Sequence, residues 1–271
     1  MTDLVVNEGR LVEWASEAID RPSFTGSEQA MGELMAETFA GMGLQVQWQQ
    51  VEDGRPNVLG TWVGTGGGKS LMFNGHMDTS YSGREPWLAG VAGFQPKAFV
   101  KDGRLFGLGI SNMKGALACY VEAVRALQDA GVRLKGDVMI AAVSGEIEKA
   151  QWGDAQGAEY RGYAAGSRYL VTHGGVADMC LLGEPTEGKL VLGHFGSLWV
   201  RISTREKSRG PTACSMRASD LGRWMNPGRS RRGARILRTS TITPWHSTRR
   251  SNTTRLLLIS ALRGPLGSRR G

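Results

Sequence analysis

A histidine and a carboxylate stand two residues apart at the end of an apolar segment. His76 and Asp78 follow residues 70–74, which read Ser-Leu-Met-Phe-Asn. An imidazole binds a metal ion through one ring nitrogen, and a nearby carboxylate that accepts the other ring N–H fixes the tautomer and raises the basicity of the ligand. Taken alone, this spacing favours a histidine without a metal role, so the metal interpretation depends on the rest of the chain.

Three more segments end in side chains that bind metals or move protons. Asn112 lies in a glycine-rich turn that leads into a helix, Glu146 and Glu148 follow the apolar residues 138–143, and Glu184 follows another apolar run. In open α/β sheets, binding sites form beyond the carboxyl ends of the strands. We therefore expect these side chains to converge with the histidine on one site.

Together these four segments resemble the zinc peptidases and deacylases that include acetylornithine deacetylase, succinyl-diaminopimelate desuccinylase, aminoacylase and the glutamate carboxypeptidases. The resemblance covers about residues 5–204. It implies a metal-dependent hydrolase, with one or two Zn²⁺ ions or alternatively Co²⁺, that cleaves an amide bond of an N-acyl amino acid or small peptide. An acetylornithine deacetylase-like activity is the expected form.

The same resemblance assigns roles to individual residues. It implies that His76 and Glu184 bind metal and that Asp78, as a catalytic residue, orients the histidine. The family usually has two adjacent glutamates, the first a general base and the second a ligand. Here isoleucine separates the two glutamates, so we expect Glu146 to be the catalytic base and Glu148 the displaced metal ligand.

Several of these assignments have alternatives. Asn112 stands where the family has an aspartate that bridges two ions; an uncharged amide predicts a mononuclear or weaker site, and asparagine also caps helices well. Glu148 is equally suited to be a solvated charge beside Lys149. For Glu184 the less favoured alternative is a surface turn before Pro185.

The other three histidines have weaker contexts. His173 and His194 are interpreted as structural or rim residues, although His194 is placed to touch substrate. The family's last histidine ligand comes late in the chain, and we do not assign that role to His246, which lies in an arginine-rich context.

Strands and helices alternate along residues 1–188, which predicts an α/β fold whose mostly parallel sheet has helices on both faces. Thr25 and Glu28 have the spacing of a capping box that opens a helix with a methionine-rich core stripe. We expect helices near residues 11–19, 28–42, 113–130 and 167–173, and strands near 44–49, 57–63, 71–74, 137–143 and 177–182.

The composition indicates a folded protein with a hydrophobic core and argues against a membrane-spanning one. The 41% hydrophobic content permits a core, and no segment approaches the ~18 apolar residues of a membrane helix. No signal peptide is apparent at the N-terminus. Cys119 and Cys180 fall in segments that we expect to be buried, and free buried thiols suit a reducing cytoplasm.

Charge divides the chain into unequal parts. Residues 1–204 carry 17 Lys/Arg and 23 Asp/Glu, whereas residues 205–271 carry 16 and 2, within an overall net charge of +8. We expect a catalytic domain over residues 1–188 and the start of a lid domain over residues 189–204. Residues 205–271 are interpreted as a disordered or out-of-frame basic tail.

This division leaves alternatives for function. One is an inactive, truncated remnant of such an enzyme, and another is a basic-tailed nucleic-acid-binding protein. The tail lacks a repeat, a fold motif and interleaved aromatic residues, so a nucleic-acid partner is not the favoured interpretation. The expected partner is a small-molecule N-acyl amino acid or peptide, with no membrane. The resemblance implies a homodimer, which an incomplete lid argues against.

Overall fold

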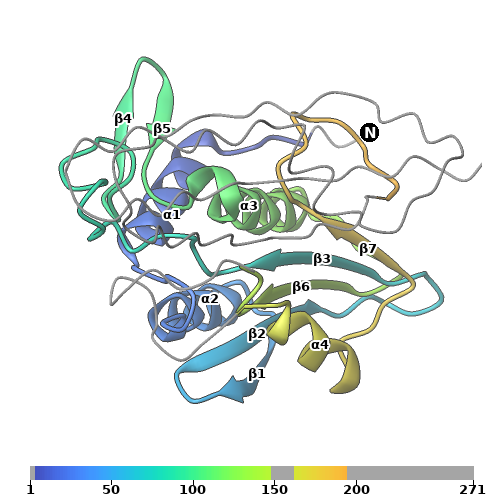
Figure 1. The fold of residues 1–271 in the computed structure, drawn as a ribbon. Coiled ribbons are helices and arrows are strands. Elements are labelled where there is room, and N and C mark those ends of the chain that lie inside the picture. The colour runs from blue at the N-terminus through green and yellow to red at the C-terminus, as the bar shows by residue number, and fades with distance from the viewer. Residues whose placement is uncertain (1–3, 148–161, 194–271) are drawn as a thin grey trace, which may run out of the picture. The chain divides into compact units, whose positions relative to one another are not determined.

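The structure is a computed structural model that describes residues 4–147 and 162–193. The chain divides into two compact units, residues 1–190 and 191–271, and all the helices and strands described here belong to the first unit (Figure 1). Glu148, His194, His246 and the expected basic tail lie outside the described residues, so the hypotheses about them stay predictions.

The two N-terminal helices form where the sequence pattern predicts them. Helix α1 spans Glu8–Asp20; the side chain of Asn7 caps it by accepting from the Arg10 N–H. Helix α2 spans Gln29–Gly41, and its methionine-rich stripe is buried as expected. Beyond α2, Gly43 adopts the positive φ of +71° that often ends a helix.

One five-stranded sheet, in the order β1-β2-β6-β3-β7, forms the centre of this unit. Strand β2 pairs antiparallel with both β1 and β6, while β3 pairs parallel with both β6 and β7, so every strand except β2 runs in the same direction. The expected mostly parallel sheet is confirmed. The strands are β1 Gln45–Glu52, β2 Arg55–Trp62, β3 Leu71–His76, β6 Val138–Val143 and β7 Met179–Leu182.

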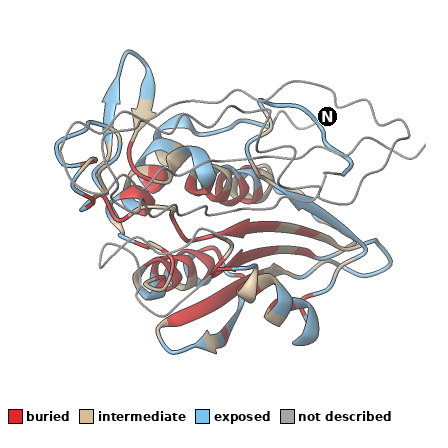
Figure 2. Cartoon of the chain, viewed as in Figure 1, coloured by how far each residue is buried: buried red, intermediate tan, exposed pale blue. Residues whose placement is uncertain are grey.

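Helices cover both faces of this sheet. Helices α1, α2 and α3 (Gly115–Asp129) share one core cluster with residues such as Val58 and Ile140 on one face. Helix α4, Ala165–Thr172, packs Leu170 against Leu59 and Ala141 on the other face. Burial is therefore concentrated along the central strands and the inward sides of the helices (Figure 2).

Two features of the first unit were not expected. A short hairpin, β4 Phe99–Lys101 and β5 Arg104–Phe106, precedes the glycine-rich turn. The turn itself is an irregular π-helical segment, η1 Ile110–Lys114, so α3 begins after it at Gly115. Within the described residues, no helix is long and apolar enough to cross a membrane.

Two expectations about local structure are wrong. Thr25 and Glu28 do not form a capping box, because α2 begins at Gln29 without a side-chain cap and both residues bond elsewhere. Cys119 and Cys180 are free but exposed. Only residues 189–193 of the expected lid are described, so the lid stays a prediction.

Candidate metal centre

His76 is brought to the candidate site by the register of the parallel strands. It is the last residue of β3 and pairs with Val143, the last residue of β6. On the other side of β3, Asn74 pairs with Leu182, the last residue of β7. The loops that carry Glu146 and Glu184 therefore leave the sheet at the same edge as the histidine, as the sequence predicted.

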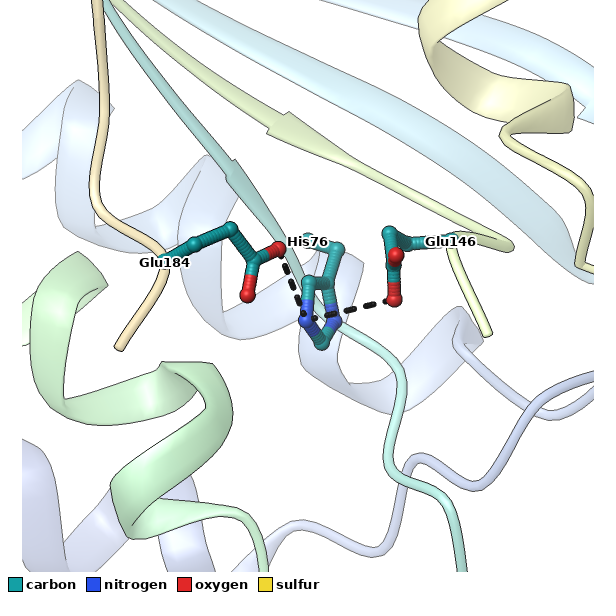
Figure 3. A group of neighbouring side chains, drawn as sticks. All are labelled: His76, Glu146 and Glu184. Carbon is teal, nitrogen blue, oxygen red and sulfur yellow. Dashed lines mark ion pairs between the residues drawn. The ribbon is translucent and has the colours of Figure 1, made fainter. Parts of the chain in front are cut away.

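Three side chains meet there at distances suited to a metal ion. The Nε2 atom of His76 lies 3.7 Å from a carboxylate oxygen of Glu146 and 3.6 Å from one of Glu184. One potential ligand atom from each residue lies within 4.8 Å of the others (Figure 3). Zinc–ligand bonds of ~2.0–2.2 Å in a tetrahedron separate ligand atoms by about 3.4 Å, which is close to the two separations from His76. Imidazole and carboxylate are also ligand types that Zn²⁺ accepts.

Asn112 faces the same imidazole. Its Oδ1 atom lies 2.7 Å from Nε2 of His76, and its backbone is extended rather than helical within η1. The residue that precedes α3 at the N-cap is Lys114, so the capping interpretation of Asn112 is wrong. The amide is therefore placed to contribute an oxygen to the site, but it adds no negative charge.

Asp78 connects His76 to the loop after β6. Its carboxylate is fully buried and accepts hydrogen bonds from the backbone N–H groups of Glu146 (3.0 Å) and Ile147 (3.1 Å) and from the Thr25 hydroxyl (2.9 Å). The same carboxylate lies 3.4 Å from Nδ1 of His76, and the Asp78 carbonyl oxygen lies 2.9 Å from that nitrogen. Asp78 thus orients both the imidazole of His76 and the loop that carries Glu146.

The charges at this site shift the ionisation of its members. Burial disfavours charge on His76, but the hydrogen bond and charge of Asp78, with the charges of Glu184 and Glu146, raise the pKa of the imidazole to about 9. Burial likewise opposes ionisation of Asp78, yet its contacts with His76 and with the two backbone N–H groups lower the pKa of that carboxyl. Three carboxylates around one imidazole thus create a strongly negative site that attracts a cation.

A second set of buried polar residues supports the site, and sequence reasoning missed it. Glu28 and Arg55 form a buried ion pair, and the Asn57 side chain accepts from the Ser144 N–H at the end of β6. The available signal was an arginine and an asparagine at the start of a strand that is otherwise apolar. The capping-box pattern obscured the contribution of Glu28.

The remaining sequence hypotheses have mixed outcomes. His173 ends α4, is exposed, and stacks on Tyr169 with ring centroids 3.6 Å apart, in agreement with a structural or rim residue. The alternative of Glu184 as a simple surface turn gains no support, because its carboxylate contacts His76.

Comparison with known proteins agrees with this geometry. The sequence profile of "Peptidase family M20/M25/M40" matches residues 72–243, more than half of the chain and beyond residue 204, where the motif resemblance ended. The succinyl-diaminopimelate desuccinylase of Gluconacetobacter diazotrophicus is 29% identical over 194 residues, which cover 69% of this chain and 47% of that protein. The chain thus spans about half the length of this curated relative.

A solved structure shows the same fold. The crystal structure of human carnosine dipeptidase 1 superimposes with a TM-score of 0.50 at 17% sequence identity, and the match covers 71% of this chain and 41% of that one. At this identity the likeness concerns the fold. The profile match covers more than half of the chain, including β6, β7, all but the first residue of β3 and the candidate metal centre: the chain belongs to peptidase family M20/M25/M40.

Proposed function

We propose that this chain binds a divalent cation through His76, Glu146 and Glu184 and hydrolyses an amide bond of an N-acyl amino acid or small peptide. The observation that supports the proposal most strongly is the convergence of an imidazole and two carboxylates at the ends of three neighbouring parallel strands. The desuccinylase and dipeptidase named above, by their names, both act on amide bonds. N-succinyl, N-acetylornithine-like and dipeptide substrates are therefore the first to test.

Zn²⁺ at this site would lower the pKa of a bound water to about 7 and polarise the substrate carbonyl. The protein's own contribution is to present the ligands in a fixed arrangement. In the tautomer with the proton on Nδ1, His76 would donate a hydrogen bond to the Asp78 carbonyl oxygen and present Nε2 to the metal. The charges of two carboxylates balance one divalent ion, and uncharged Asn112 favours a mononuclear site.

Glu146 is the proposed general base. Its carboxylate is 41% exposed, so water reaches it, and its backbone is fixed by the hydrogen bond to Asp78. A base must take a proton from the attacking water and pass it to the leaving amine. The same carboxylate also lies 3.7 Å from Nε2 of His76, a separation at which both groups can bind one metal ion. The roles of general base and metal ligand therefore compete for this side chain.

Metal content and turnover, measured on the same samples, test the proposal. The full chain is loaded with Zn²⁺ or Co²⁺, its metal is quantified, and amine release is followed for N-succinyl and N-acetyl amino acids and for dipeptides. Because Glu146→Gln is expected to bind Zn²⁺ more weakly, it is assayed at a Zn²⁺ concentration that fills its site. Metal-dependent release in the parent that is absent from this metal-saturated variant supports the base role. A chain that takes up no divalent metal contradicts the proposal.

A metal-binding protein without turnover is the second candidate. Two observations favour it: Asn112 contributes no charge, and Glu146, the proposed base, stands where a ligand would stand. If Glu146 binds the ion, another group must serve as base. Stoichiometric metal uptake with no amine release from any of the three substrate classes would select this candidate.

A further inference from the structure

A buried ion pair lies beneath the loop that carries Glu146. Arg55 and Glu28 are 1% and 0% exposed, and the guanidinium donates two hydrogen bonds to the carboxylate, from Nε at 3.0 Å and from a terminal nitrogen at 2.9 Å. The other terminal nitrogen donates to Glu52 at 2.7 Å. Desolvating two charges is costly, and burying them adds little stability compared with well-packed apolar side chains. A function other than stability would explain the pair.

The guanidinium contacts the backbone next to Glu146. A Cβ atom on Gly145 would lie 2.5 Å from a terminal nitrogen of Arg55, so only glycine leaves room for the arginine. Gly145 also has φ of +68°, a region that favours glycine. The turn that positions Glu146 therefore packs directly against the guanidinium of Arg55.

The carboxylate side of the pair extends toward His76. Glu28 ends the connector between α1 and α2, residues 21–28, which runs along the loop after β3. In this connector the Ser23 hydroxyl donates to the Met77 carbonyl oxygen at 2.7 Å, and the Ser23 carbonyl oxygen accepts from Thr79 at 2.8 Å. Thr25 donates to the Asp78 carboxylate. The pair thus joins the loop after β6 to the connector that holds the loop after β3.

We propose that the Arg55–Glu28 pair is a positioning element that sets the placement of Glu146 relative to His76 and thereby the affinity for the metal. Neither residue belongs to the ligand group; both act through Gly145 and the connector. Residues that hydrogen-bond to metal ligands typically change metal affinity by 10- to 100-fold. Arg55 acts on Glu146 one step further out, through Gly145. The inference rests on the proposed metal site and names what fixes its geometry.

A second Arg–Glu pair provides a matched control. Arg10 also makes a two-fold hydrogen bond to a nearly buried glutamate, Glu122, at 2.7 and 2.9 Å. That pair connects α1 to α3, and within the described residues its other hydrogen bonds join Glu122 to the Asn7 N–H and Arg10 to Asp129. Breaking either pair should destabilise the fold, because one charge is left without its partner, but only the Arg55 pair should affect the metal.

The test measures Zn²⁺ affinity of the full chain by competition with a chromophoric chelator, together with the visible absorption of the Co²⁺-loaded protein. Arg55→Met should weaken Zn²⁺ binding at least tenfold and alter the Co²⁺ spectrum, whereas Arg10→Met should leave both within twofold. Thermal melts report stability separately, and Arg55→Lys, which retains one charged donor, should recover part of the affinity.

A double variant covers the case in which Arg55→Met does not fold. Glu28→Leu combined with Arg55→Met leaves no uncompensated buried charge, which is the main cost of breaking such a pair. Weak Zn²⁺ binding by this folded variant supports the inference. Parental affinity in either Arg55 variant overturns it while leaving the proposed metal site intact. If the parent itself binds no Zn²⁺, the proposed function fails and this inference with it.

Discussion

The loops after β3 and β6 differ sharply from the loop after β7, although all three contribute to one site. The first two are buried and cross-linked: His76 and Asp78 are almost inaccessible, and Asp78 holds the backbone of Glu146. Strand β7 is exposed along its whole length and lies at the edge of the described sheet. The Glu184 side chain, 31% exposed, is about as accessible as that of Glu146, 41% exposed, so the two loops differ in the contacts that fix their backbones. Two of the three proposed ligands are therefore preorganised by hydrogen bonds, whereas the third depends on a less constrained edge.

This difference predicts unequal contributions to metal binding. A ligand whose loop is already fixed loses little conformational freedom when the ion arrives, so more of its interaction appears as affinity. A ligand on an exposed edge must be ordered by the ion, and water replaces it more easily.

Replacing each glutamate by glutamine tests that inequality most strongly. We expect Glu146→Gln to weaken Zn²⁺ binding by about 100-fold or more and Glu184→Gln by about tenfold, since each loses a charged ligand but only Glu146 is preorganised. Glu187→Gln, an exposed residue paired with Lys189, is the control and should bind as the parent does. Titration against a chelator gives all three values. A larger loss for Glu184 than for Glu146 would reverse the comparison.

Removing the charge that links the two buried loops should have the next largest effect. We expect Asp78→Asn to lower Zn²⁺ affinity by about 10- to 100-fold, because an amide cannot accept all the hydrogen bonds that this carboxylate accepts. The control is Asp178→Asn at the opposite end of the sheet, where the carboxylate accepts from Ser70. Equal Zn²⁺ affinities for the two variants would contradict the linking role of Asp78.

The buried part of the site also predicts a pH dependence of stability in the metal-free protein. The folded-state pKa of His76, about 9, lies above the ordinary value of 6.5, so the stabilisation is complete below pH 6.5 and is lost as the pH rises through 9. We expect the free energy of unfolding of the parent, relative to His76→Gln, to fall by about 2 kcal/mol across this window, less than the full shift because the glutamates are partly exposed.

Urea unfolding of both proteins at several pH values measures this difference. The comparison with His76→Gln is necessary because burial lowers the pKa of Lys114 to about 7, which makes stability rise with pH over the same range. A difference between parent and variant that is constant from pH 6.5 to 9 would show that the carboxylates do not raise the pKa of His76.

The smallest expected change concerns Asn112. Asn112→Asp adds a negative charge 2.7 Å from Nε2 of His76 and should strengthen Zn²⁺ binding severalfold, to an extent limited by repulsion from the carboxylates already present. The same titration reports how many ions bind. Weaker binding would show that the amide contributes in a way that a carboxylate cannot.

Much of the fold was predictable because periodicity and strand ends are local signals. The stripe from Met31 to Met42, the apolar strand before His76 and the helix after the glycine-rich turn all appear where the sequence places them. The β4–β5 hairpin was missed because three-residue strands leave almost no periodic pattern. The capping box failed because Thr25 and Glu28 gain more from Asp78 and Arg55 than from the end of a helix.

The candidate site was predictable in its members but not in its supports. His76, Glu146 and Glu184 follow recognisable strand ends, and the register of parallel strands brings them together. Arg55 begins β2, which pairs antiparallel with β6, and its side chain reaches Gly145 in the loop after β6. The two residues are far apart in the sequence, so no motif could predict this contact. Whether Glu148 is a ligand or a solvated charge depends on residues outside the described part of the chain.

Zinc titration of His76→Ala beside His173→Ala tests the central claim most directly. His76 lies at the centre of the ligand group, whereas the exposed ring of His173 bonds within its own helix to the Tyr169 carbonyl oxygen. The account predicts that the first variant loses stoichiometric Zn²⁺ binding and that the second keeps the affinity of the parent. If His76→Ala takes up Zn²⁺ as tightly as the parent, the metal centre described here does not exist.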